Sequence, residues 1–210
     1  MAIVHLGAKR LQGTKVDRVL DSLGSSADGS NTGITLLSQN LNFNSSSSDN
    51  AIVYDLGSGN VSDTQWVLRF ELDLTQYDSS NSSSDAVAIG IASADQATIT
   101  GSQSGIGLEI GCGTSDTEYR MALANSATWV RGTKYSIFTR TPKAEKIYVE
   151  IKRTSGTEVV ITQYEDSGFS TSLESKTNNS NVSGISGLRY LSVKCDSQNV
   201  GNTCIGSTNT

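Results

Sequence analysis

The sequence predicts an all-β protein, an antiparallel β-sandwich that follows an irregular N-terminal arm. From residue 51 onward, short segments alternate apolar and polar residues, as expected for strands with one buried face. Clusters of Gly, Ser, Asn and Asp separate these segments and predict turns. No segment keeps the period of 3.6 residues that an amphipathic helix requires, so no helix longer than a turn or two is expected.

Residues 1–50 differ from the rest of the chain and are expected to form the arm. This stretch mixes short apolar steps with turn residues and sustains neither the strand period nor the helix period. The polar tract NFNSSSSDN (42–50) marks its end, so the sandwich is expected to span residues 51–210. Loops of such length are uncommon in compact domains, which leaves two interpretations: an irregular leader, or an extension that docks on a neighbouring subunit.

The expected strands follow one another at short spacing after this boundary. The clearest hairpin joins KIYVEIKRT (146–154) to EVVITQYE (158–165), with Ser155 and Gly156 as its turn. The longest expected strand is WVLRFELDLT (66–75), in which every second residue from Trp66 is apolar. The remaining strands are expected at AIVYDLG (51–57), AVAIGIAS (86–93), GIGLEIGCG (105–113), YRMALAN (119–125), KYSIFTRT (134–141) and LRYLSVKC (188–195).

Charge and hydropathy exclude two classes of partner. With 16 basic and 21 acidic residues the net charge is -5, so there is no broad positive field to attract phosphate backbones, and nucleic-acid binding is not expected. No run of residues approaches the roughly 18 to 20 apolar residues that a membrane-spanning helix needs. The start of the chain also lacks the apolar segment of a secretory signal.

The cysteines and the single histidine exclude a structural zinc site. Cys112, Cys195 and Cys204 show no C-x-x-C spacing, and His5 is the only imidazole. Two states remain open for Cys195 and Cys204: a disulfide across a short terminal hairpin, or free thiols in a reducing setting.

The order of these patterns resembles that of concanavalin A-like, laminin G-like jelly-roll domains, from about residue 50 to residue 195. Trp129, Gly132 and Tyr135 match a strand-opening W-x-x-G-x-x-Y pattern, and LRYL (188–191) matches the penultimate strand. The resemblance implies a final strand that contains Asp and pairs near the N-terminus. The chain ends instead in NVGNTCIGSTNT (199–210), so this strand is expected to be missing or to be replaced by the arm or a partner.

The same superfamily includes glycoside hydrolases that carry Glu-x-Asp-x-x-Glu on one strand. Glu71 and Asp73 would share a strand face, about 6.6 Å apart along the strand, but position 76 is Gln, which cannot protonate a leaving group. We therefore expect no enzymatic activity. The simpler interpretation is a solvated strand face on which Arg69 and Glu71 are able to pair.

The resemblance also implies glycan recognition, which requires an aromatic ring for the sugar's CH face and polar groups for its hydroxyls. The residues expected to provide them lie at or near loop boundaries: Tyr77, Asp78, Asp116 and Tyr119. Such domains often bind calcium through loop carboxylates, and Asp78 and Asp85, on either side of a serine-rich tract, are the expected ligands. No other cofactor is expected.

Two functions of different class follow. In the first, the protein is a non-catalytic structural or assembly subunit, located outside a cell or on a virion surface, that self-associates through its arm or an open sheet edge and has some capacity for glycan recognition. The alternative is a monomeric, calcium-assisted carbohydrate-binding module, and a more remote one is a relative of the glycoside hydrolases.

Overall fold

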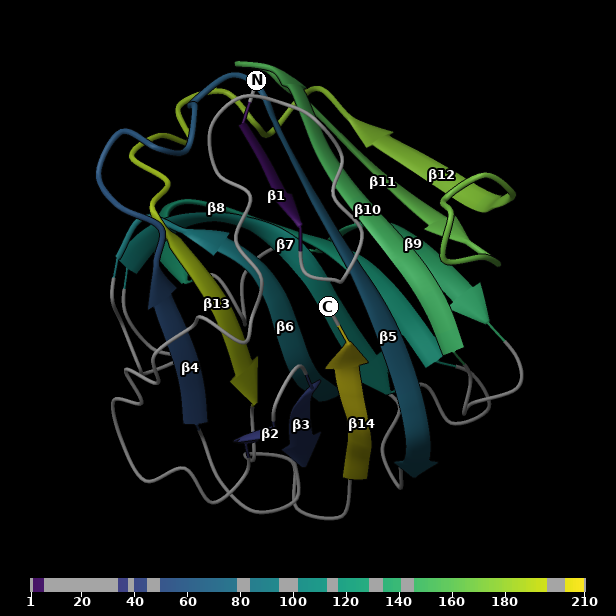
Figure 1. Ribbon diagram of the computed structural model, residues 1–210. Helices are drawn as coiled ribbons and strands as arrows, with labels where there is room; N and C mark the ends of the chain where they lie inside the picture. The colour runs from purple at the N-terminus through teal and green to yellow at the C-terminus, as the bar shows by residue number, and fades with distance from the viewer. Residues whose placement is uncertain are drawn as a thin grey trace.

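The computed structural model describes residues 2–5, 34–37, 40–44, 50–78, 84–94, 102–112, 117–128, 134–140, 146–195 and 203–209. None of these residues is helical, and accordingly no helix able to cross a membrane occurs among them. They form two sheets, one of eight strands and one of six, stacked face to face (Figure 1). The predicted all-β sandwich is confirmed.

The strands of the two sheets have the following order. The eight-stranded sheet runs β12 (Ser172–Asn178), β11 (Glu158–Tyr164), β10 (Lys146–Ser155), β5 (Trp66–Asp78), β14 (Thr203–Asn209), β3 (Asn40–Asn44) and β2 (Ile34–Leu37), with β1 (Ala2–His5) also paired to β5. The six-stranded sheet runs β4 (Asn50–Asp55), β13 (Tyr190–Cys195), β6 (Ser84–Ala92), β7 (Ser102–Cys112), β8 (Thr117–Thr128) and β9 (Lys134–Arg140).

The central strand of the eight-stranded sheet is β5, which is paired along both edges. On one edge it pairs antiparallel with β10. On the other edge, β1 pairs in parallel with residues 66–69 and β14 pairs antiparallel with residues 71–78. The expectation that the final strand is missing is wrong, because residues 203–209 form β14 and close the sheet beside β5.

Part of the expected arm belongs to the sandwich. Within residues 1–50, β1 pairs with β5, β2 pairs with β3, and β3 pairs with β14. Because these segments are too short for a strand period to be visible in the sequence, they were expected to be irregular. Residues 6–33 lie outside the described part of the chain. The hairpin of β10 and β11 is confirmed, but its turn lies one residue later than predicted, at Gly156 and Thr157.

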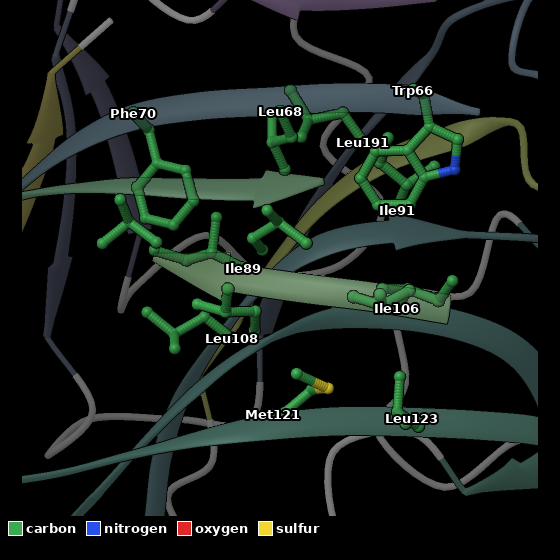
Figure 2. Close-up of a cluster of buried hydrophobic side chains, with 14 of the residues drawn as sticks. Trp66, Leu68, Phe70, Ile89, Ile91, Ile106, Leu108, Met121, Leu123 and Leu191 are labelled. Atoms are coloured by element: carbon green, nitrogen blue, oxygen red, sulfur yellow. The ribbon is translucent and has the colours of Figure 1, made fainter. Parts of the chain in front are cut away.

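The hydrophobic core lies between the sheets. Alternate residues of β5, namely Trp66, Leu68, Phe70 and Leu72, are fully buried, as the alternation predicts. Figure 2 shows Trp66, Leu68 and Phe70 together with residues of the opposite sheet, labelled Ile89, Ile91, Ile106, Leu108, Met121, Leu123 and Leu191. Every one of these side chains is at most 5% exposed, which is why β5 holds a fixed register between β10 and its other neighbours.

Small side chains gather on the outer face of the six-stranded sheet, beside a buried ion pair. Ala88 and Ala92 on β6 and Ala122 and Ala124 on β8 form a second buried cluster, each at most 2% exposed. We call this cluster the small-residue face. On the same sheet, Glu109 and Arg120 lie opposite each other on β7 and β8 and form a buried ion pair.

Candidate functional site

The outer face of the eight-stranded sheet carries charged side chains. On β5, the residues between the core positions are Arg69, Glu71 and Asp73, all half-buried. They are paired across the ladder with β10: Arg69 lies opposite Glu150, and Asp73 lies opposite Lys146. The predicted solvated face is therefore present, but it is shared between strands that are distant in the sequence.

The ion pairs of this face run between the strands. Arg69 hydrogen-bonds to Glu150 through Nε and also contacts it through its terminal nitrogen. Lys146 Nζ lies 2.8 Å from Glu71 Oε1 and 3.5 Å from Asp73 Oδ2. The expected pair of Arg69 with Glu71 is thus replaced by cross-strand pairs, because opposite residues on neighbouring strands lie closer, at about 4.5 to 5.5 Å, than residues two apart on one strand.

A loop between β11 and β12, residues 165–171, folds back over this face. Its centre is Asp166, whose carboxylate accepts hydrogen bonds from the backbone N–H of Gly168 at 2.9 Å and of Thr171 at 2.7 Å. The same carboxylate accepts hydrogen bonds from the N–H and hydroxyl of Ser170. Asp side chains commonly organise turns in this way. The bonds hold Phe169 at a φ of 55°, a left-handed conformation that non-glycine residues rarely adopt.

Three aromatic rings meet where this loop contacts the sheet, and we call them the ring platform: Tyr148 on β10, Tyr164 on β11 and Phe169 in the loop. The centroid of Phe169 lies 6.0 Å from that of Tyr148 and 5.4 Å from that of Tyr164, both edge-to-face. The guanidinium carbon of Arg69 lies 5.0 Å from the Phe169 centroid, in cation–π contact. All three rings are half-buried, so part of each ring surface is open to solvent.

Burial and neighbouring groups shift the pKa values of two tyrosines and one aspartate at the site. Burial, and then the charge of Glu71, raise the pKa of Tyr148, and burial followed by the charge of Glu150 raises the pKa of Tyr164. The pKa of Asp166 is lowered, mainly by the hydrogen bond from the Thr171 N–H. At neutral pH the site thus presents protonated phenols beside ionised Asp166.

Of the four residues predicted for glycan binding, the structure describes the side chain of Tyr119 alone. Tyr119 lies on the inner face of β8 and is fully buried, so its ring cannot contact a ligand at the surface. It was expected at a loop boundary, but β8 begins at Thr117, and strand alternation turns Tyr119 to the same side as Met121. Tyr77 and Asp78 end β5, and Asp116 lies outside the described residues.

The calcium and cysteine expectations fall at the ends of strands. Asp78 is the last residue of β5 and Asp85 the second of β6, so the predicted ligands belong to different sheets. Among the side chains that the structure describes, no three carboxylate, imidazole or thiol groups gather as a metal site would require. Cys195 ends β13 in one sheet, and Cys204 lies in β14 of the other. Calcium and the disulfide remain predictions.

Sequence reasoning missed the ring platform and the loop that completes it. The signal is the segment EDSGFST (165–171), in which an Asp precedes Gly, Ser and Thr donors and one aromatic residue lies among turn residues. Phe169 lies in a turn and not in an alternating strand, so the strand pattern does not assign its ring to the core. This feature of the sequence indicates a ring at the surface.

The fold is shared with several lectin and binding domains. Peanut lectin, solved with a nine-residue peptide, is 10% identical with a TM-score of 0.53, covering 90% of this chain and 92% of that one. The exoplasmic/lumenal domain of VIP36, bound to Ca²⁺ and Man3GlcNAc, is 8% identical with a TM-score of 0.54, covering 88% and 81%. The binding domain of botulinum neurotoxin serotype D is 13% identical with a TM-score of 0.50, covering 90% and 43%.

No family model and no curated protein matches the sequence. At the identities of these solved structures the likeness concerns the fold alone. The protein therefore has a lectin-like β-sandwich of the concanavalin A-like jelly-roll type, as the sequence resemblance predicted.

Proposed function

We propose that the protein is a non-catalytic lectin-like domain that recognises a glycan on the outer face of the eight-stranded sheet, outside a cell or on a virion surface. The observation that carries this proposal is the ring platform with its frame of carboxylates. Tyr148, Tyr164 and Phe169 offer partly exposed rings, and sugars bind proteins by stacking their CH face on such rings. The lectin-like fold supports the same conclusion.

The polar groups around the platform suit sugar hydroxyls. Glu71, Asp73 and Asp166 are partly exposed acceptors, and each carboxylate accepts several hydrogen bonds. Their positions are fixed before any ligand arrives, because Lys146 holds the first two and the loop N–H groups hold the third. A fixed arrangement loses little conformational freedom on binding, which favours affinity for a weakly held ligand such as a sugar.

The residues expected from the sequence would extend this surface. β5 continues from Asp73 to Tyr77 and Asp78, about 13 to 16 Å further along at roughly 3.3 Å per residue. We propose them as the far end of a site that holds an extended glycan, with Asp78 and Asp85 as calcium ligands. The pairing of Glu71 and Asp73 with Lys146, together with Gln76 in place of an acid, supports a binding role rather than hydrolysis.

An array of neutral oligosaccharides tests this proposal, using the full chain and two variants. Phe169→Ala and Tyr148→Ala each remove one ring of the platform, and we expect each to weaken binding by about tenfold, since stacking rings contribute roughly 1 to 1.5 kcal/mol. Tyr190→Ala is the matched control, because Tyr190 is equally half-buried but lies on the other sheet beside Arg189. Equal loss of binding in all three variants would contradict the proposed site.

We also propose self-association through the N-terminal segment, a role that one observation favours. Among the described residues, β1 pairs with β5 alone, through a parallel ladder. The 28 residues from 6 to 33 connect β1 to β2, and a chain of that length can reach a neighbouring molecule. Because β14 fills the rest of this edge, an open edge left by a missing strand no longer supports assembly. Light scattering of the full chain and of a chain without residues 1–5 tests it: loss of oligomers supports exchange of β1, and a monomer in both removes the proposal.

A further inference from the structure

The charged groups around the ring platform are mostly acidic. Four carboxylates frame the rings: Glu71, Asp73, Glu150 and Asp166. Two cations, Arg69 and Lys146, lie among them, so four negative and two positive groups leave a local net charge of about -2 at neutral pH. The ring platform therefore lies in a locally negative electrostatic field.

Both cations of the site are already engaged. Arg69 is bound to Glu150 and lies over the ring of Phe169, and Lys146 lies between Glu71 and Asp73. The donors that bind Asp166 are uncharged N–H and hydroxyl groups, so its negative charge is not neutralised by an ion pair with them. A ligand carboxylate would have to displace one of these protein carboxylates to gain a cation.

The tyrosines of the platform respond to the same field. Beyond burial, the charge of Glu71 raises the pKa of Tyr148, and the charges of Glu150 and Asp166 raise that of Tyr164. If either tyrosine lost its proton, the phenolate would place a negative charge where a ligand would stack. The raised pKa values of Tyr148 and Tyr164 therefore indicate that a negative charge is disfavoured at this position.

We infer that the ring platform selects uncharged sugars and disfavours sugars that carry a carboxylate or sulfate. This inference rests on the proposed glycan-binding function and gives its ligand class. Opposed like charges at contact distance reduce affinity, and they do so more strongly at low ionic strength.

The experiment compares matched glycans that differ only in charge. Cello-, manno-, malto- and chito-hexaoses are titrated against the full chain by calorimetry, together with counterparts oxidised to carboxylates at C6. For each neutral hexaose that binds, we expect its oxidised counterpart to bind about five- to tenfold more weakly at low salt. In 1 M salt, where the Debye length is about 3 Å, this ratio should fall below about twofold.

Two variants locate the effect. Glu71→Gln removes one carboxylate and leaves Lys146 paired with Asp73 alone, so the affinity ratio should narrow. Glu158→Gln makes the same change on β11 about 20 Å from Tyr164, at roughly 3.3 Å per residue, and should leave the affinity ratio unchanged. Tyrosine titration by NMR adds a readout without any ligand, because Glu71→Gln should lower the pKa of Tyr148.

Each outcome separates the inference from the function. Weaker binding of oxidised glycans that salt and Glu71→Gln both relieve supports the inference. Equal or tighter binding of oxidised glycans overturns the charge preference and leaves glycan recognition intact. Binding of neither form overturns the proposed function and the inference with it, and an unchanged Tyr148 titration in Glu71→Gln overturns the assignment of the field to Glu71.

Discussion

The outer faces of the two sheets have the same backbone structure but differ in how deeply their side chains are buried. The face of the eight-stranded sheet carries long charged residues and three rings, half-buried and linked across strands. The small-residue face of the six-stranded sheet consists of alanines that are at most 2% exposed. The difference teaches that strand alternation alone does not distinguish a partly exposed, charged face from a packed layer. The burial of the outward side chains makes that distinction, since Glu109 and Arg120 are long and charged yet buried beside the alanines.

Adding bulk to each face gives the largest expected difference. Ala88 is fully buried, so Ala88→Leu must displace its neighbours, and we expect the free energy of unfolding to fall by about 1 to 3 kcal/mol. Lys152→Leu places the same side chain on the exposed outer face of β10 and should change stability by less than about 0.5 kcal/mol. Urea denaturation measures both, and equal losses would show that the two faces do not differ in packing.

A smaller effect is expected from the backbone of Phe169. Both Phe169→Ala and Phe169→Gly remove the ring, but only glycine also relieves the left-handed φ of 55°. The alanine variant should be less stable than the glycine variant by about 0.5 to 1 kcal/mol, since the relief of strain exceeds the entropy that glycine gains when unfolded. Thermal unfolding of the pair measures this difference, and a more stable alanine variant would exclude strain at this position.

The smallest expected effect is a change with pH confined to the loop. The folded pKa of Asp166 is below its ordinary value, so its stabilising contribution is complete above about pH 4 and is lost as pH falls through the folded pKa. Near-UV circular dichroism of the platform tyrosines should therefore change on acidification in the full chain. In Asp166→Asn this pH dependence should disappear, whereas Glu165→Gln, a neighbouring change, should retain it. A transition that persists in Asp166→Asn would assign the titration to another group.

The sequence predicted what depends on local pattern. The alternation around Trp66 and Leu68 identified the buried face of β5, and the hairpin of β10 and β11 was found within one residue. The pair of Arg69 and Glu150 was not predictable, because it joins residues 81 positions apart through a register that only the folded sheet defines. Tyr119 was placed at a loop boundary because the expected strand began there, whereas β8 begins two residues earlier, so Tyr119 lies within the strand and faces the core.

The pairing of β1 and β14 with the same edge of β5 brings the ends of the described chain together. Ala2 lies opposite Trp66 and Asn209 opposite Glu71, so five residues of β5, about 16 Å at roughly 3.3 Å per residue, separate them (Figure 1). A linker of about six residues spans this distance. The sandwich is thus suited to circular permutation, in which a linker joins Asn209 to Ala2 and new ends open at the Gly156 and Thr157 turn, with every ladder of β5 retained.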